Sequence, residues 1–112
     1  MKRLENKVAV ITGGADGLGR AAALKFSAEG ATVIIWDMNE EKGALTVSEI
    51  EKTGSKASFE KVNTASYAEV EAATKNATDK FGRIDILINN AGITRDASIK
   101  KMTPDMWQQV ID

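Results

Sequence analysis

The sequence contains no cysteine and no histidine, and it has a single proline among its 112 residues. The lack of cysteine excludes disulfides, thiol catalysis and thiolate metal sites, and the lack of histidine removes the most common general base. Because 15 basic residues nearly balance 16 acidic ones, nothing in the charge attracts nucleic acid or an anionic membrane. No apolar run approaches the ~20 residues of a membrane span, and the charged start predicts no signal peptide, so we expect a cytoplasmic protein.

The composition otherwise matches a globular domain of ordinary size. Hydrophobic residues make up 43% of the chain and charged residues 28%, a balance that argues against global disorder. A chain of this length can bury a core of its own, and it is too short for two typical domains. We therefore expect residues 1–112 to fold as a single domain.

Short apolar runs rich in β-branched residues alternate along the chain with segments of helical periodicity. Strands are predicted at residues 7–12, 31–36, 56–62 and 83–89, and helices at residues 18–29, 40–52 and 66–82, with another helix from Thr103 onward. Such alternation predicts a parallel sheet with helices on both faces, which is an α/β fold.

Apolar side chains at helical spacing indicate which face of each helix is buried. The expected core residues are Leu18, Ala22 and Phe26 in the first helix, Ala44, Val47 and Ile50 in the second, Val70, Ala73, Ala77 and Phe81 in the third, and Trp107, Val110 and Ile111 in the fourth. Gly30, Gly54 and Gly82 are placed to end the first three helices. Gly43 lies inside the second helix and lowers its intrinsic propensity.

A glycine-rich loop joins the first predicted strand to the first predicted helix, with the sequence Thr12-Gly-Gly-Ala-Asp-Gly-Leu-Gly19. Glycines at positions 13, 17 and 19 allow a sharp turn and leave no Cβ between the start of the helix and a ligand. The free N–H groups and the positive end of the helix dipole suit a pyrophosphate. Because the loop follows a strand and opens a helix, a dinucleotide site is favoured over the alternative, a tight turn with close packing.

Asp37 ends the second predicted strand, at about the 20-residue distance from the glycine loop at which dinucleotide-binding folds place an acid. Its carboxylate is suited to accept hydrogen bonds from the hydroxyls of the adenosine ribose, and it would repel a 2′-phosphate. No lysine or arginine occupies residues 36–39, so we expect NAD to be favoured over NADP. The alternative is a surface acid at the end of a strand.

Asp16 lies inside the glycine loop, where an acid opposes phosphate binding unless its side chain points away or caps the helix at Leu18 or Gly19. A plain N-cap is the alternative interpretation of this residue. The other acidic residues of this part of the chain, Glu40, Glu41, Glu49 and Glu51, are interspersed with Lys42 and Lys52. That pattern indicates a solvated helix face, and we predict no metal site.

Two motifs together make the chain resemble the short-chain dehydrogenases/reductases. The first is the glycine loop, and the second is Asn89-Asn-Ala-Gly92, which follows the fourth predicted strand. The segments Ala91–Asp96 and Met102–Trp107 resemble the branch of 3-oxoacyl-acyl-carrier-protein reductases and acetoacetyl-CoA reductases. The resemblance covers essentially the whole chain. It implies half of a Rossmann doubly wound fold, with a four-stranded sheet in the order 3-2-1-4.

The resemblance also implies a role in binding the cofactor for eleven residues. They are Gly13, Asp16, Gly17, Leu18 and Gly19 in the phosphate loop, Asp37 at the ribose, Asn63 and Thr64 at the adenine, and Asn90, Ala91 and Gly92 along the ribose region of the cofactor. Asn63 stands where the family usually has an aspartate, and an amide oxygen can accept the same bond from the adenine amino group. For the two asparagines, the alternative is structural: their amides tie the fourth strand to neighbouring loops.

The catalytic residues that the resemblance implies are an asparagine, a serine and a Tyr-x-x-x-Lys pair, all C-terminal to the Asn-Asn-Ala-Gly motif. The only tyrosine of this chain, Tyr67, precedes that motif and is followed four residues later by Glu71 rather than by lysine. We assign no catalytic residue. The chain is interpreted as the N-terminal, NAD(H)-binding half of a short-chain oxidoreductase, truncated before its catalytic half and inactive alone.

A sheet in the order 3-2-1-4 leaves its fourth strand at an edge. We expect Ile84, Ile86, Leu87 and Ile88 to lie on this edge, where apolar strands without lysine or proline recruit further strands. A homodimer through this strand, or through exchange of the last helix, is therefore predicted. Two alternatives stay open for the chain as a whole: a weak binder of other adenosine ligands such as S-adenosylmethionine, and an engineered self-associating scaffold.

Overall fold

The sheet of the computed structural model contains the four expected strands, and the structure describes residues 3–90. The strands are β1 (Val8–Thr12), β2 (Thr32–Asp37), β3 (Ala57–Lys61) and β4 (Ile86–Asn89). All three strand pairs are parallel, in the order β3-β2-β1-β4, which confirms the predicted topology. The fourth helix, and the motif residues Ala91 and Gly92, lie outside the described residues.

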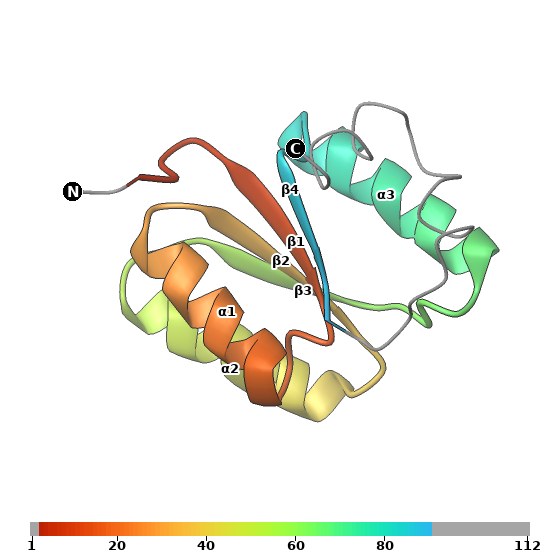
Figure 1. Ribbon diagram of the computed structural model, residues 1–112, viewed down its shortest axis with the longest axis horizontal. Helices are drawn as coiled ribbons and strands as arrows, with labels where there is room; N and C mark the ends of the chain where they lie inside the picture. The colour runs from red at the N-terminus through yellow and green to blue at the C-terminus, as the bar shows by residue number, and fades with distance from the viewer. Residues whose placement is uncertain (1–2, 91–112) are drawn as a thin grey trace.

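Helices cover both faces of this sheet, as the alternating pattern predicts. The helices are α1 (Gly17–Ala28), α2 (Glu40–Lys52) and α3 (Tyr67–Phe81). Figure 1 shows α1 and α2 together on one face of the sheet and α3 on the other. Each helix begins with a polar cap, since the side chains of Asp16, Asn39 and Ser66 accept hydrogen bonds from N–H groups of the first turn.

In α1 and α2 the buried face is shifted by about one position along the sequence from the face that we predicted. Gly19, Ala23 and Ser27 are the buried residues of α1, whereas Leu18, expected in the core, is 80% exposed. In α2 the buried positions include Gly43 and Thr46 instead of Ala44. Small side chains face the sheet because these two helices lie close to it, so size overrides hydrophobicity in choosing the buried face. The buried face of α3 is as predicted, with Val70, Ala73 and Ala77 in the core.

β4 is shorter than the predicted strand at residues 83–89. At Asp85 a side chain takes the place that a backbone carbonyl has in a regular strand. Asp85 Oδ2 accepts the Val8 N–H at 2.8 Å, and the backbone N–H of Asp85 donates to the Val8 carbonyl. Ile84 is therefore a buried core residue and not part of an exposed strand. Leu87 is buried as well, so of the four residues expected on the edge only Ile86 and Ile88 keep partial exposure.

The carboxyl ends of the strands meet at the start of α1. The loop after β1 turns there into α1, and the ends of β2 and β4 lie beside it (Figure 1). The register aligns Thr12 with Trp36 of β2 and with Asn89 of β4. Polar residues that directly follow these strands are therefore gathered at one edge of the sheet. Within residues 3–90, no helix is both long enough and apolar enough to cross a bilayer.

Candidate functional site: the glycine loop and the end of the second strand

The glycine loop turns sharply between β1 and α1 because two of its glycines adopt left-handed backbone angles. The φ angle is 66° at Gly13 and 58° at Gly17. The N–H of Gly13 donates to the Trp36 carbonyl of β2 at 2.8 Å, which fixes the start of the loop. The N-terminus of α1, with Gly17 and Leu18 exposed, then faces solvent at the carboxyl edge of the sheet. This arrangement presents backbone N–H groups and the positive end of a helix dipole to an anion.

Gly19 is the position of closest approach between α1 and the loop. A Cβ at Gly19 would overlap the carbonyl group of Gly13 and would come within 2.7 Å of Asn90 Nδ2. Only glycine fits there without moving the loop. The third glycine of the motif is thus explained by packing, and the first and second are explained by backbone conformation.

Asp37 closes the other side of the loop. Its Oδ2 accepts the Ala15 N–H at 3.1 Å, and its Oδ1 accepts the Asn39 N–H at 2.9 Å. The carboxylate is only partly buried, and two hydrogen bonds leave acceptor positions on both of its oxygens. The acid predicted from spacing therefore lies in direct contact with the glycine loop, and it can still accept hydroxyl donors from a ligand.

A cleft of about 330 Å³ runs from the loop past Asp37 to the segment after β3. Its lining residues are Gly13, Trp36, Asp37, Met38, Val62, Asn63 and Thr64. Asn63 and Thr64 thus share one cleft with Asp37. The Oδ1 of Asn63 accepts the Ala65 N–H at 3.0 Å, and one lone pair of that oxygen remains for another donor.

The end of β4 is tied to the end of β1 by polar groups. The N–H of Asn90 donates to Thr12 Oγ1 at 2.8 Å, and Thr12 Oγ1 lies 3.1 Å from Asn89 Oδ1. Asn90 Nδ2 also approaches the Gly13 carbonyl at 3.5 Å. These contacts tie the end of β4 to β1 and to the glycine loop. They also bring Asn90 next to this loop.

Asp16 is an N-cap, and it is also half of an ion pair. One oxygen accepts the Gly17 N–H at 2.7 Å, and the other accepts a hydrogen bond from Lys42 Nζ of α2 at 2.8 Å. The hydrogen bond from Lys42 is the main cause that lowers the pKa of Asp16, and the same contact raises the pKa of Lys42. The cap is made to Gly17 and not to Leu18 or Gly19, so the carboxylate points toward α2.

Two residues of α2 that belong to this site were not identified from the sequence. Thr46 is 1% exposed, and its hydroxyl donates to the Ala15 carbonyl at 3.1 Å. This hydrogen bond links α2 to the glycine loop. Lys42 is the ion-pair partner of Asp16. A threonine on the apolar side of an otherwise polar helix was the available signal for Thr46. For Lys42 the sequence carried no signal, since its proximity to Asp16 depends on how α2 packs.

The hydroxyl of Tyr67 is bonded to an acid of its own helix. It donates to Glu71 Oε2 at 2.9 Å, and this hydrogen bond raises the pKa of Tyr67 above its usual value. Tyr67 begins α3, where Ser66 provides the cap. The Glu69 N–H donates to Ser66 Oγ, and the Glu69 carboxylate accepts the Asn63 N–H.

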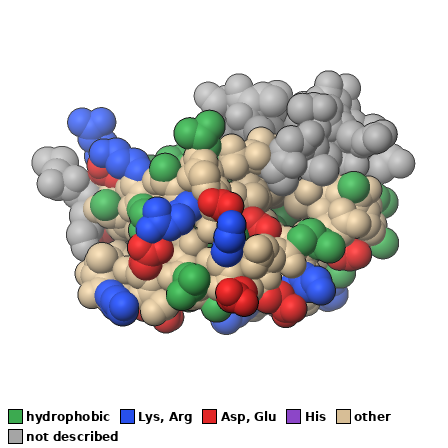
Figure 2. Space-filling view, turned by 90° about the horizontal axis from the view of Figure 1, so that it is seen from below, with side chains coloured by type: hydrophobic (Ala, Val, Ile, Leu, Met, Phe, Trp, Pro, Cys, Tyr) green, Lys and Arg blue, Asp and Glu red, His purple; other side chains and the backbone are tan. Residues whose placement is uncertain are grey.

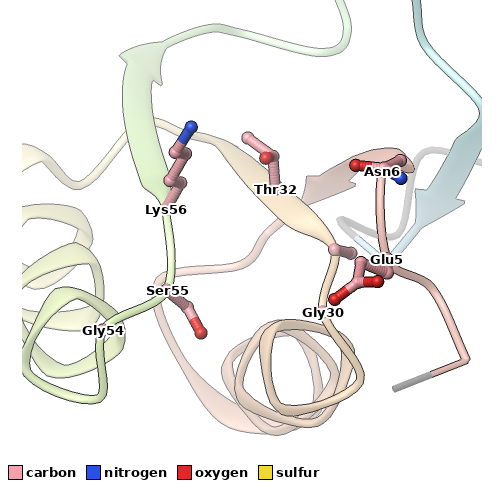
Figure 3. A pocket seen from close by; sticks show the side chains of 8 residues that line it. Glu5, Asn6, Gly30, Thr32, Gly54, Ser55 and Lys56 are labelled. Atoms are coloured by element: carbon pink, nitrogen blue, oxygen red, sulfur yellow. The ribbon is translucent and has the colours of Figure 1, made fainter.

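A second cavity, of about 220 Å³, lies at the opposite end of the sheet. Its lining residues are Glu5, Asn6, Gly30, Ala31, Thr32, Gly54, Ser55 and Lys56. In Figure 3 the side chains of Glu5 and Lys56 extend from opposite sides of this cavity and do not point to a common centre. Ligands of open α/β sheets bind at the carboxyl ends of the strands, and this cavity lies at the amino ends. The cleft beside Asp37 is therefore the better candidate.

Comparison with known proteins identifies the family. The family described as short chain dehydrogenase matches residues 7–112. The chain belongs to the short-chain dehydrogenase family. It is 42% identical over 110 residues to the 3-oxoacyl-(acyl-carrier-protein) reductase FabG of Chlamydia muridarum, an alignment that covers 97% of this chain and 44% of that protein. This short-chain dehydrogenase sequence thus spans less than half the length of the curated relative it matches.

Solved structures of the same family superpose on the described sheet. The NAD+-bound xylitol dehydrogenase is similar with a TM-score of 0.79 and 31% identity, over 81% of this chain and 35% of that one. A metagenomic short-chain oxidoreductase in complex with NADP gives a TM-score of 0.77 and 32% identity, over 80% of this chain and 41% of that one. The family therefore includes both NAD-bound and NADP-bound proteins, and membership alone sets no preference between them.

Proposed function

We propose that this chain binds the adenosine diphosphate part of NAD, as the cofactor-binding half of a short-chain oxidoreductase similar to the 3-oxoacyl reductases. The observation that carries the proposal is the contact between Asp37 and the glycine loop at the mouth of a cleft. One continuous surface offers N–H groups for a pyrophosphate, a carboxylate for ribose hydroxyls and polar groups at Asn63 and Thr64 for a base. The charges of these groups, and their sequence along the surface, match the pyrophosphate, ribose and base of an adenosine diphosphate.

In this proposal each element of the site has one task. The N-terminus of α1 holds the pyrophosphate, at a turn that Gly13, Gly17 and Gly19 make possible and next to the exposed Leu18. Asp37 orients the adenosine ribose. Asn90 lies along the ribose region of the cofactor, and the same place is proposed for Ala91 and Gly92, which are outside the described residues. The bound dinucleotide supplies hydride-transfer chemistry. A preference for NAD over NADP follows from the Asp37 carboxylate, which repels a 2′-phosphate.

We also propose that the 112 residues alone turn over no substrate at a useful rate. Hydride transfer to a carbonyl needs a proton donor held in register with the cofactor. The only tyrosine in the sequence is Tyr67, which hydrogen-bonds to Glu71 and lacks the paired lysine. With contacts to only part of a dinucleotide, the affinity is expected in the range from about micromolar to about millimolar.

Calorimetric titration of the 112-residue chain with ADP, NAD and S-adenosylmethionine tests the proposal. We expect saturable binding of ADP and NAD, and a loss of at least about tenfold in Asp37→Ala, because a charge-assisted hydrogen bond is removed. The matched control is Glu5→Ala, which removes an acid from the cavity at the other end of the sheet and is expected to leave binding unchanged.

Three results would contradict the proposal. They are S-adenosylmethionine binding without NAD binding, equal effects of Asp37→Ala and Glu5→Ala, and rapid NADH oxidation by this chain with a 3-oxoacyl thioester. The first would favour a different adenosine ligand. The second would remove Asp37 from the site. The third would show that a catalytic group has been overlooked.

A second copy of the chain is the partner that we propose for the β4 side of the sheet. Among the described residues β4 pairs with β1 alone, and Ile86 and Ile88 on it are partly exposed. Leu4, Phe26 and Ile86 line an open groove of about 770 Å³ beside the strand. Exchange of the last helix, the other predicted route to a dimer, involves residues outside the described part.

A further inference from the structure

Ala15 lies in the middle of the glycine loop, and its two backbone polar groups are held by side chains of two different elements. The residue is 3% exposed, so its N–H and its carbonyl need partners within the protein. Asp37 at the end of β2 accepts the N–H at 3.1 Å, and Thr46 of α2 donates its hydroxyl to the carbonyl at 3.1 Å. Within residues 3–90, no other donor bonds to this carbonyl. The Ala15 carbonyl therefore depends on Thr46.

The hydroxyl of Thr46 serves the loop more than it serves its own helix. Thr46 is 1% exposed, whereas the solvent-facing side of α1 and α2 carries interspersed acidic and basic side chains (Figure 2). Its hydroxyl also lies 3.1 Å from the Lys42 carbonyl, one turn earlier in α2. That carbonyl is inside the helix, where the backbone ladder already supplies a donor. The bond to Ala15 is the one that has no substitute.

The peptide unit between Ala15 and Asp16 carries this contact to the start of α1. The described residues contain no cis peptide bond, so the Ala15 carbonyl and the Asp16 N–H of this unit point in opposite directions. Because Thr46 draws the carbonyl toward α2, the Asp16 N–H points away from α2. Asp16 is exposed and directly precedes Gly17, where α1 begins. The buried hydroxyl thus sets the direction of a backbone donor at a helix N-terminus, where N–H groups attract anions.

We propose that Thr46 is a positioning residue for the phosphate-binding loop, in which it keeps the N–H groups before α1 turned toward a bound pyrophosphate by holding the Ala15 carbonyl. The inference rests on the proposed function, since it assumes an adenosine diphosphate at the loop. Without the hydroxyl, the buried carbonyl has no donor, and the peptide unit is stabilised by turning this carbonyl toward water. The Asp16 N–H then turns away from the ligand. Binding of the phosphates should suffer more than binding of the adenosine part.

Calorimetry with ADP and with adenosine on the 112-residue chain tests this role. Thr46→Val keeps the shape of the side chain and removes the donor, and it is expected to weaken ADP binding about three- to tenfold. Adenosine lacks the phosphates, and its dissociation constant should change less than about twofold. Thr46→Ser keeps the hydroxyl and loses a methyl group, so it should bind ADP within about twofold of the wild type even though its stability falls.

Amide hydrogen exchange, measured without ligand, reports on the loop itself. In Thr46→Val the amides of Ala15 and Asp16 should exchange about three- to tenfold faster than in the wild type, since the bond that holds the loop to α2 is lost. The matched control is Thr74→Val. Thr74 is a buried threonine of α3, on the other face of the sheet, and its hydroxyl donates to the Val70 carbonyl at 2.7 Å. This control should change neither ADP binding nor exchange in the loop.

Several outcomes would overturn the inference and leave the proposed function standing. They are wild-type ADP affinity or wild-type loop exchange in Thr46→Val, an equal loss of affinity in Thr74→Val, and a loss in Thr46→Ser as large as that in Thr46→Val. If Thr46→Val does not fold, Thr46→Ala replaces it and is compared with Thr46→Ser, from which it differs by the hydroxyl alone. Failure of the wild type to bind ADP overturns the proposed function itself, and this inference with it.

Discussion

Gly19 lies where α1 crosses the first turn of the glycine loop, and no other residue type fits this crossing. We predict that Gly19→Ala displaces the loop, because a Cβ would overlap the Gly13 carbonyl. Overpacking of this kind costs about 1–3 kcal/mol of the free energy of unfolding. The affinity for ADP should fall by more than the stability loss explains, since the N–H groups of the loop move. Chemical denaturation and calorimetry measure the two quantities.

Ser27→Ala is the control for this prediction, since Ser27 is another small buried residue of α1, far from the loop. It is expected to change the stability slightly and the ADP affinity not at all. If Gly19→Ala bound ADP as the wild type does, the close approach of α1 to Gly13 would have no role in holding the phosphate loop.

For single residues, the sequence predicts those that can be identified from motifs within one short stretch of the chain. The glycines and Asp37 follow from spacing along the chain, and the structure brings Asp37 into contact with Ala15 of the glycine loop. Lys42 and Thr46 could not be predicted in the same way. Each acts on a loop some 30 residues earlier in the chain, Thr46 on Ala15 and Lys42 on Asp16, and such contacts depend on the packing of α2 against α1.

Gly43 allows α2 to pack closely against β3 of the sheet. A Cβ at Gly43 would overlap the ring of Phe59 on β3. We predict that Gly43→Ala destabilises the protein, although alanine is the better helix former by about 1 kcal/mol. The overlap with the ring costs about 1–3 kcal/mol and outweighs the gain in propensity. Urea denaturation measures the difference.

Two further variants separate packing from propensity. Ser48→Ala, at an exposed position of the same helix, gains propensity without overlap and is expected to stabilise slightly. Gly43→Ala combined with Phe59→Leu removes part of the ring and should recover part of the loss. A stabilising effect of Gly43→Ala alone would show that α2 can move away from β3 at little cost.

The same close packing explains which parts of the elements were predicted. The alternation of strands and helices, the helix bounds to within a residue or two and the face of α3 follow from periodicity and caps, whereas the strand order was implied by the family resemblance. The faces of α1 and α2 do not follow from periodicity, because Gly19 and Gly43 face the sheet while Leu18 faces solvent. The predicted start of the fourth strand at residue 83 was also wrong, since β4 begins at Ile86. There the Asp85 side chain takes the place of a backbone acceptor, a substitution that hydrophobic patterning does not encode.

On the scale of the whole molecule, the two sides of the sheet are unequally covered. α3 buries Leu87 of β4 and Ile84 just before it, whereas on the other face Ile86 and Ile88 pack at the margin of the core and keep partial exposure. The groove beside this strand is lined by Leu4, Phe26 and Ile86 together with the charged residues Arg3, Lys25 and Glu29. An edge strand next to apolar side chains favours pairing with another strand. A two-fold axis would bring β4 of one copy against β4 of a second.

We therefore predict that the 112-residue chain self-associates and that Ile86→Lys suppresses the association. Sedimentation velocity at increasing concentrations is expected to show a rising mean mass for the wild type and a constant monomer mass for the variant, because a lysine on an edge strand opposes pairing. Leu45→Lys makes the same chemical change at an exposed leucine of α2 and should associate as the wild type does. A monomer mass for the wild type at every concentration would exclude the β4 interface. Equal loss of association in both lysine variants would assign the effect to net charge, and the surface beside β4 would then have no special part in it.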